Sequence, residues 1–390
     1  MWTTPGHEKF RQEIREFAES EIAPYSKKYD REQSFADKII PRLNNMGLLG
    51  MQVDKKYGGT FTDTLTYIIA VEEVSRVDGS VGITLAAHNS LGNFPIYKFG
   101  TEDQKKKYLP VITTGGKLAA FGLTEPGAGS DAGGTKTFAQ KTGGGYKVNG
   151  TKCWITCAGV AETVVFTART SREGGTKGIS SFVVGNGTPG FSSGKKENKM
   201  GLRGSDTRFL HFDDLFIPEA DRLGEEGQGF KQFMITLDGG RISIGAMALG
   251  LAQGAFDIAA AYAATHLENG EPVGHQQSIG FKLADMATQI QAARHLIYHA
   301  AILKDKETRF SKESAMAKLF ASEVGNFCTY TAIGILGEDG LTDRYPVERM
   351  YRDVKLCEIG EGTSEIQRLV ISRILLKEAA EKPLGFGLSG

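Results

Sequence analysis

The chain has 390 residues, of which 40% are hydrophobic, so it is long enough for two or three domains with sizeable cores. Its 46 Lys and Arg balance its 46 Asp and Glu, which argues against a nucleic-acid-binding protein and an electrostatic membrane anchor. No stretch approaches the roughly 18–20 apolar residues of a transmembrane helix, and the polar N-terminus predicts no secretory signal.

Four cysteines are present, which suits a reducing compartment: Cys153, Cys157, Cys328 and Cys357. Only the first two are close in sequence, and no second cluster of metal-binding residues supports them. We therefore expect structural thiols and predict no metal site.

Residues 1–118 predict an N-terminal all-α domain. Phe10, Ile14 and Phe17 form one face of a first helix, which we expect Pro24 to end. A second apolar face covers 39–46, and Gly47 follows it as a helix stop. Two further apolar helices are expected at 65–77 and 81–91.

The residue pattern changes at 119–230 from helical periodicity to short β-rich runs, and it predicts a small barrel-like β domain. Tyr146 and Val148 would face Lys152 and Trp154 across Asn149-Gly150, and this dipeptide is the strongest short signal for a β-hairpin. Short β-rich runs follow at 164–168, 179–184 and 208–212, and the segments between them carry Gly, Ser and Thr.

Residues 231–390 predict a C-terminal all-α domain. Long Ala-rich helices are expected at 242–266, 277–304 and 312–336, and a last helix starts after Glu361. The chain therefore runs from helices to strands and back to helices, which gives an α+β fold class.

Glu361 stands between Gly360 and Gly362, just before this last helix. Ser364 and Gln367 match the spacing of a capping box, which predicts that the helix begins there. A carboxylate beside the free N–H groups of a helix start is one way to build a general base next to an oxyanion site. The alternative is a solvated glutamate in an ordinary turn.

Three segments resemble the acyl-CoA dehydrogenase family: FGLTEPGAGSDAGG at 121–134, YPVERMYRDVKL at 345–356 and EIGEGTSEIQRLVI at 358–371. The resemblance runs nearly end to end. It implies an N-terminal helical domain, a middle β-barrel-like domain and a C-terminal four-helix bundle. It also implies FAD-dependent α,β-dehydrogenation of an acyl-CoA, with Glu361 as the base and electron-transfer flavoprotein as the partner.

The Gly-rich turn after Phe121 could also be a plain turn, and a single tryptophan in a strand is usually core. No GxGxxG motif follows a strand, so a nicotinamide site is not supported. The resemblance implies FAD contacts from fourteen residues: Phe121, Leu123, Thr124, Gly129, Ser130, Trp154, Ile155, Thr156, His266, Gln277, Gly334, Gly337, Thr363 and Glu365.

The resemblance also implies substrate contacts from Ser130, Asp238, Arg241, Gly360 and Gly362. Asp238 and Arg241 match positions that contact the pantetheine and adenosine of CoA, although a salt bridge at a helix start would also explain Arg241.

Several glycines carry predictions of their own. Some family members place the base at positions matching Gly239 and Gly240, so here the base must be Glu361. Gly360 replaces a bulky aromatic residue of many members, which leaves room for a branched or broad acyl chain. Residues 81–83 carry no cation where relatives that oxidise glutaryl-CoA have an arginine, so we expect an uncharged acyl group. We also expect burial to raise the pKa of Glu361 once substrate is bound.

Four residues depart from the family at positions that reach the FAD of a neighbouring subunit: His266, Asn269, Gly334 and Glu338. A histidine clamps phosphate less strongly than an arginine. We therefore expect that the neighbouring subunit binds FAD more weakly than is usual, or that the subunits form a different interface. The resemblance implies that the homo-oligomer is a tetramer, and the four departures leave a dimer as the alternative.

Two other functions stay open. An acyl-CoA oxidase would use oxygen, although such chains are generally much longer. A flavin-poor acyl-CoA-binding paralogue would fit the four departures. We expect a cytoplasmic protein of bacteria or, as the alternative, a protein of the mitochondrial matrix.

Overall fold

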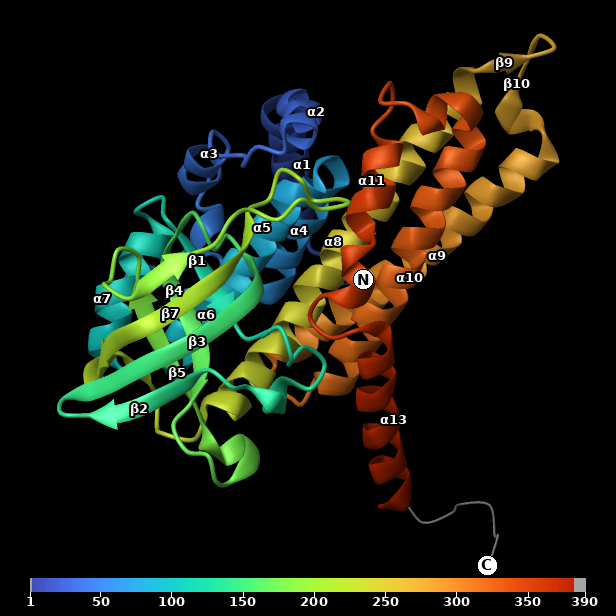
Figure 1. Cartoon of the computed structure of the whole chain (residues 1–390). Helices are drawn as coiled ribbons and strands as arrows, with labels where there is room; N and C mark the ends of the chain where they lie inside the picture. Colours follow the sequence, from blue (N-terminus) through green and yellow to red (C-terminus); the bar gives the residue numbers. More distant parts are fainter. Residues whose placement is uncertain (1, 382–390) are drawn as a thin grey trace, which may run out of the picture.

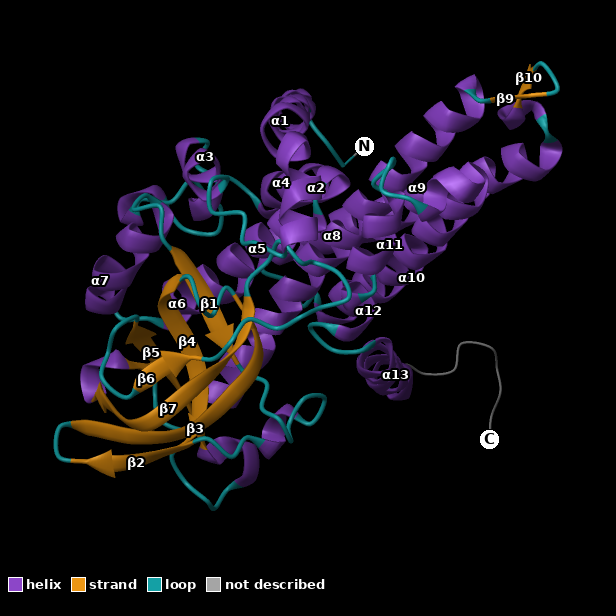
Figure 2. Ribbon diagram, turned by 45° about the horizontal axis from the view of Figure 1, so that its top comes forward, coloured by secondary structure: helices purple, strands orange, loops and turns teal. Residues whose placement is uncertain are grey.

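The computed structural model describes residues 2–381, so the ends of the predicted first and last domains, residue 1 and residues 382–390, lie outside it. A twisted sheet lies on one side of the molecule, and long helices run across the other side (Figure 1). Helices cover the sheet where it faces the rest of the chain (Figure 2). The predicted order of helices, strands and helices is confirmed.

The N-terminal part holds seven α-helices: α1 (Pro5–Phe17), α2 (Ala23–Glu32), α3 (Ile40–Asn45), α4 (Thr64–Val77), α5 (Gly79–Ala87), α6 (Phe94–Phe99) and α7 (Glu102–Thr113). The prediction that Pro24 ends the first helix is wrong. A π-helical segment, Ala18–Ile22, joins α1 to α2, and Pro24 falls in the first turn of α2. Proline fits there because the first N–H groups of a helix need no intrahelical acceptor.

The sheet domain contains eight strands: β1 (Leu118–Gly122), β2 (Phe138–Thr142), β3 (Gly145–Thr156), β4 (Ala161–Arg169), β5 (Ile179–Gly185), β6 (Phe191–Ser193), β7 (Thr207–Pro218) and β8 (Arg222–Leu223). Their order is β6-β7-β3-β2-β4-β5-β8, and β1 pairs in parallel with β4. The three β-rich runs expected from the sequence fall in β4, β5 and β7.

The predicted hairpin at Asn149-Gly150 is wrong, because both residues lie inside β3. The chain turns instead at Gly143-Gly144, between β2 and β3. Gly150 marks a register shift against β7, and a Cβ there would lie 2.5 Å from Thr137 Oγ1. The glycine therefore serves a close backbone approach within a bulged strand.

The C-terminal part is built on α8 (Gly229–Thr265), α9 (Gln277–Asp305) and α10 (Ser311–Leu336), which pack along one another. A short pair, β9 (Leu267–Glu268) and β10 (Glu271–Pro272), lies at the tip between α8 and α9. Three helices follow: α11 (Val347–Val354), α12 (Leu356–Ile359) and α13 (Ser364–Ala380). Helix α13 packs on α10 and projects away from the body (Figure 1).

Helix α8 corrects two sequence predictions. It begins at Gly229, well before the expected start at 242, and carries Gly239 and Gly240 in its interior. It is also long and apolar enough to cross a membrane by length and composition, contrary to the expectation that no such stretch exists. Of the apolar 18-residue segment of α8 that meets this criterion, 78% is buried inside the molecule, as in the core helix of a globular protein.

The four cysteines are buried and none forms a disulfide. Burial raises the pKa of Cys157, Cys328 and Cys357 to about 12, so these thiols stay protonated. This burial agrees with structural thiols, a role that stays a prediction.

Candidate active site

Glu361 occupies a short loop between α12 and α13. It has a positive φ of 56°, which is uncommon for a residue with a side chain, and Gly362 follows with a φ of 94°. Backbone of this kind persists only where the surroundings hold it, and such positions cluster at functional sites. The glycine after Glu361 allows the chain to leave this conformation and enter α13.

The cap of α13 differs from the prediction. Thr363 is the N-cap, and its Oγ1 accepts from the backbone N–H of Ile366. Ser364 is already inside the helix, so the predicted Ser364–Gln367 capping box is wrong. The Gln367 side chain instead donates from Nε2 to the Glu361 carbonyl at 3.2 Å and to the Gly362 carbonyl at 2.9 Å. The threonine was the better signal because it directly precedes the helix.

The Glu361 carboxylate points into the protein and lies against α8. Both carboxylate oxygens are buried and have no hydrogen-bond partner among residues 2–381. A Cβ on Gly240 would lie 2.0 Å from Glu361 Oε2 and 3.0 Å from Leu91 Cδ2. The missing side chain of Gly240 therefore provides the space that the carboxylate occupies.

Burial raises the pKa of Glu361 to about 7, while the positive charges of Lys318 and Arg241 act in the opposite direction. Burial exceeds the two attractions even without substrate. The predicted effect of burial in the substrate complex stays a prediction. A carboxylate that titrates near neutral pH is suited to general-base catalysis.

Asp238 and Arg241 pair with each other in the middle of α8. Arg241 Nη1 donates to Asp238 Oδ1 at 2.5 Å, and Ser311 Oγ donates to Asp238 Oδ2 at 2.6 Å. The salt bridge considered for Arg241 thus exists, but inside a helix and not at its start. Contact of this pair with CoA stays a prediction.

The two predicted flavin segments are adjacent in the sheet domain. The Cys153 N–H donates to the Thr124 carbonyl at 2.8 Å, which ties the end of β3 to the Gly-rich turn. Beneath them, the fully buried Lys152 donates from Nζ to Glu125 Oε1 at 2.8 Å. Glu125 in turn accepts from the backbone N–H groups of Lys136 and Thr137. The turn is therefore held from below by a buried ion pair.

Trp154 stands out from the strand. It has a φ of 60° at a register shift between β3 and β7, and its side chain is 60% exposed. A β-bulge re-aims a side chain in this way. Next to it, Ile155 is buried in the core, so its predicted contact with FAD stays a prediction.

The Gly-rich turn leaves open space above it, since a Cβ on Gly127 or Gly129 would meet nothing within 4 Å. Ser130 is exposed, and Thr124 and Thr156 are partly exposed. An open turn lined by hydroxyls beside an exposed indole fits a ring system and its phosphates. Phe121 is different, because it stacks on Phe233 with ring centroids 4.0 Å apart.

The remaining predicted FAD contacts form two other groups. Thr363 and Glu365 lie at the start of α13, next to Glu361. His266, Gln277, Gly334 and Gly337 are exposed near the tip of the long helices, at the end opposite the sheet (Figure 1). Within one chain, the structure does not bring this tip group together with the flavin segments. The His266 ring stacks on Tyr262 with centroids 4.5 Å apart.

Sequence reasoning missed two buried lysines that touch the site, Lys152 and Lys318. Lys318 Nζ donates to the Gly362 carbonyl at 2.7 Å. A lysine within an apolar helical pattern, as in AMAKLFAS, was the available signal, because buried lysines are rare unless they are paired.

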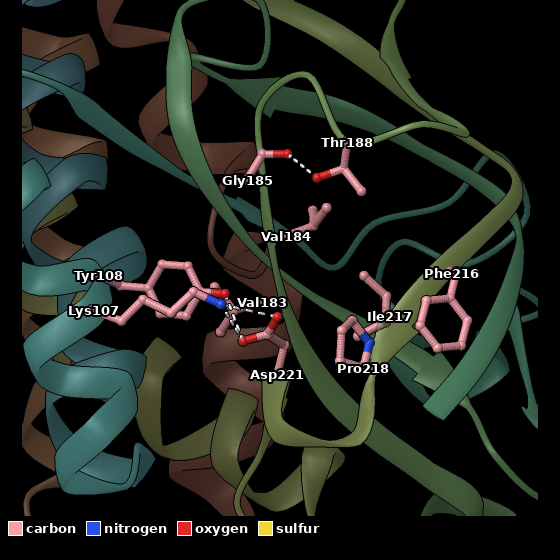
Figure 3. A pocket seen from close by; sticks show the side chains of 10 residues that line it. All are labelled: Lys107, Tyr108, Val183, Val184, Gly185, Thr188, Phe216, Ile217, Pro218 and Asp221. Carbon is pink, nitrogen blue, oxygen red and sulfur yellow. Dashed lines mark hydrogen bonds and ion pairs between the residues drawn. The ribbon is translucent and has the colours of Figure 1, made fainter. Parts of the chain in front are cut away.

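A separate cavity of about 230 Å³ lies between the sheet and α7 (Figure 3). Its polar groups already satisfy one another, since Lys107 Nζ and Tyr108 OH both donate to Asp221. The cavity shares no residue with the predicted flavin or acyl-CoA contacts.

Three family models match the chain: the N-terminal domain of acyl-CoA dehydrogenase at residues 4–116, the middle domain at 120–215 and the C-terminal domain at 227–376. A probable acyl-CoA dehydrogenase of Bacillus subtilis is 48% identical over 96% of this chain and 99% of its own length. A short-chain-specific acyl-CoA dehydrogenase of Clostridium acetobutylicum is 46% identical over 95% of this chain and 97% of its own.

Solved structures agree with the fold. Butyryl-CoA dehydrogenase of Megasphaera elsdenii superposes with a TM-score of 0.94 at 43% identity, over 96% of this chain and 99% of that one. A chain from a structure of the electron transferring flavoprotein of Acidaminococcus fermentans superposes with a TM-score of 0.95 at 44% identity, over 96% of this chain and 99% of that one. An acyl-CoA dehydrogenase of Bacillus anthracis, 33% identical with a TM-score of 0.91, was solved with FAD; it covers 97% of this chain and 68% of that one.

With three family models matched along its length and a relative 48% identical over 96% of it, the chain belongs to the acyl-CoA dehydrogenase family and is an FAD-dependent oxidoreductase that acts on acyl-CoA.

Proposed function

We propose that this chain dehydrogenates an uncharged short, branched or medium acyl-CoA to the trans-2-enoyl-CoA, with Glu361 as the base that removes the α-proton. The observation that supports this most is the Glu361 carboxylate, whose two buried oxygens have no partner among the described residues. A buried polar group without a partner is costly, so its persistence indicates a role in function.

Glu361 acts in its ionised form. Its pKa of about 7 leaves a large ionised fraction near neutral pH and still gives a base strong enough to share the proton in the transition state. Gly240 gives the carboxylate its space, and the positive φ of Glu361 directs it toward α8. Such a positioned base contributes about 10²–10⁴ in rate.

The backbone of the same residue supports the reaction. The Glu361 N–H has no acceptor within the described part of the chain, so it is free to donate to the thioester oxygen as negative charge develops. FAD, when bound, supplies the acceptor for the β-hydride. Thr124, Ser130, Trp154 and Thr156 are the side chains we assign to hold it, on the open turn and bulge.

The contacts of the nearby cations support an uncharged acyl group. Lys318 donates to a backbone carbonyl, and Arg241 is paired with Asp238. On α5, a Cβ at Gly82 would lie 2.1 Å from Ser75 Oγ, so that position has no room for a side chain. Room for branching is supported at Gly360, where a Cβ would meet only Leu356, at 3.5 Å.

We also propose a homo-oligomer, a tetramer or, given His266, Asn269, Gly334 and Glu338, a dimer. The tip group of predicted FAD contacts requires a second copy to reach a flavin seat. The C-terminal helices support this with large exposed apolar side chains: Phe281, Tyr330, Leu341, Leu369 and Leu376. The mass in solution distinguishes the two states.

We propose electron-transfer flavoprotein as the electron acceptor. We also propose that the protein is located in the bacterial cytoplasm. The similarity to a chain from an electron-transferring-flavoprotein structure supports the first, and the bacterial relatives support the second. We keep the domain boundaries 1–118, 119–230 and 231–390 as part of the proposal.

The test is the visible spectrum of the purified protein with a panel of short, branched, medium and dicarboxylic acyl-CoAs, repeated for Glu361→Gln. We expect flavin absorbance that bleaches with uncharged substrates and persists in the variant. Bleaching in Glu361→Gln at the wild-type rate would remove Glu361 as the base. Rapid re-oxidation by air would favour the oxidase, and a protein that takes up no FAD would favour the binding paralogue.

A further inference from the structure

Lys318 is a fully buried lysine in the middle of α10 that the mechanism above does not use. Its Nζ donates to the Gly362 carbonyl at 2.7 Å. Within the described residues no carboxylate lies at ion-pair distance from it. A buried ammonium without a direct counter-ion is costly, so its position beside the Glu361 loop calls for a functional reason.

Gln367 approaches the same loop from the other side. It is fully buried in the first turn of α13, and its Nε2 reaches both the Glu361 and the Gly362 carbonyls. The Gly362 carbonyl thus accepts from two side chains that belong to different helices. We call this pair of donors, Lys318 and Gln367, the loop clamp.

The loop has the shape that the clamp requires. Glu361 keeps a positive φ of 56°, which costs free energy unless contacts stabilise it. At Gly362, a Cβ would lie 2.6 Å from Gln367 Nε2, so a side chain there would push Gln367 away. Glycine at this position is needed both for its φ of 94° and for the approach of the clamp.

We propose that Lys318 and Gln367 are positioning residues for Glu361: together they hold its loop so that the carboxylate stays in the space beside Gly240, and the ammonium of Lys318 also favours the ionised carboxylate. This inference rests on the proposed role of Glu361 as the base. A displacement of about 1 Å at a reacting group costs up to about 100-fold in rate, so a clamp of this kind has a measurable effect.

The charges around Glu361 support the second half of the proposal. Lys318 and Arg241 both lower the pKa of Glu361 against the larger effect of burial, and Lys318 is the larger of the two. Burial lowers the pKa of Lys318 to about 8, so the lysine is still mostly charged where Glu361 ionises. The titratable and charged groups that act on the pair from neighbouring elements are Tyr67 on α4, Arg241 on α8, and Cys357 and Glu358 on α12.

The two members of the clamp differ in charge, which allows a sharp test on the FAD-loaded enzyme. Lys318→Met removes donor and charge, Lys318→Gln keeps a donor but removes the charge, and Gln367→Met removes a donor without changing charge. Lys199→Met is the matched control, because Lys199 is also substantially buried and donates to a carbonyl, that of Ser205 at 2.8 Å, but lies outside the site.

We expect kcat to fall about 10- to 100-fold in Lys318→Met and in Gln367→Met with little change in KM, and to stay within about twofold of wild type in Lys199→Met. The acid limb of the pH profile of kcat/KM moves to higher pH in Lys318→Met and Lys318→Gln, and stays in place in Gln367→Met. The isotope effect with α-deuterated substrate rises in all three clamp variants, because proton removal becomes the slower step.

Melting temperature and flavin content, measured alongside, separate lost folding from lost positioning, and Lys318→Gln serves if Lys318→Met does not fold. The proposal is overturned if the lysine variants keep both the wild-type acid limb and the wild-type isotope effect, whatever their stability. Failure of the proposed base would be seen independently, as wild-type turnover in Glu361→Gln.

Discussion

The carboxylate of Glu361 fills the space that a side chain at Gly240 would take. A Cβ on Gly240 would lie 2.0 Å from Glu361 Oε2, far inside van der Waals contact. The two residues are far apart in sequence: Gly240 lies inside α8, and Glu361 lies in the loop before α13. The neighbouring Gly239 differs, since a Cβ there would meet only the end of Lys304, at 3.5 Å.

Gly240→Ala should therefore displace the carboxylate of Glu361. We expect kcat to fall about 10- to 100-fold, because a base moved by about an ångström loses its alignment with the α-proton. Gly239→Ala is the matched control and should stay within a few fold of wild type, since its methyl group has room. Steady-state kinetics of both variants on one acyl-CoA decide the matter; equal rates in the two variants would contradict the assigned packing.

The pH dependence of the enzyme should follow Glu361. Because the base works when ionised and its pKa is about 7, kcat/KM should rise as pH increases through about 7 and level off above it. The profile is measured with a substrate that does not itself titrate in this range. A rise centred near 4.5, the ordinary value of a glutamate, would show that the carboxylate is solvated in the working enzyme.

The burial of Glu361 should also lower the free energy of unfolding when the carboxylate is ionised. The folded-state pKa lies above the ordinary value of 4.5, so the folded protein holds the proton more tightly and loses stability as pH rises from about 4.5 to about 7. Glu361→Gln has the same shape without the charge. It should raise the free energy of unfolding by roughly 1–3 kcal/mol above pH 7 and by little near pH 4. Melting curves at both pH values test this, and a gain of equal size at both would contradict it.

Trp154 should contribute to FAD binding by offering its exposed ring at the bulge of β3. We expect Trp154→Ala to weaken FAD binding about 2- to 10-fold, in line with the worth of one aromatic stacking contact. Titration of the apoprotein with FAD measures this. Phe216→Ala is the control, because Phe216 is also an exposed aromatic residue of the sheet, 48% exposed, but lines the other cavity (Figure 3). Equal loss in both variants would mean that Trp154 has no specific contact with the flavin.

Gly360 should widen the acyl site. Its φ of −67° is allowed for any residue, and a Cβ there makes only ordinary contact with Leu356. Gly360→Tyr should therefore fold, keep activity on a straight short acyl-CoA within a few fold and lose about tenfold or more on a branched one. Ile359→Tyr places the same ring at a neighbouring exposed position and should leave this ratio unchanged. An unaltered ratio in Gly360→Tyr would place the acyl chain elsewhere.

The sequence by itself determined the class of fold and the family, and it indicated the candidate site residues. Apolar periodicity predicted most helices, and short β-rich runs predicted strands, because both signals depend on local burial patterns. Long motifs around Thr124 and Glu361 indicated the family. Local signals failed where tertiary contacts overrode them: Asn149-Gly150 became a strand bulge instead of a turn, and the glycine pair of α8 remained helical because other groups pack against it.

Only the tertiary structure decided how Glu361, the proposed base, is held. No spacing in the sequence connects Gly240 on α8 and Lys318 on α10 with Glu361, since residues this far apart meet only when the helices pack. Gln367 is close to Glu361 in sequence, but its spacing predicted a capping box and not its contact with the Glu361 carbonyl. The buried state of the carboxylate, and hence the rise of its pKa, also arises only after packing has removed water. The sequence therefore specified the chemical groups, and the packing of three helices around one loop set their geometry and their charge.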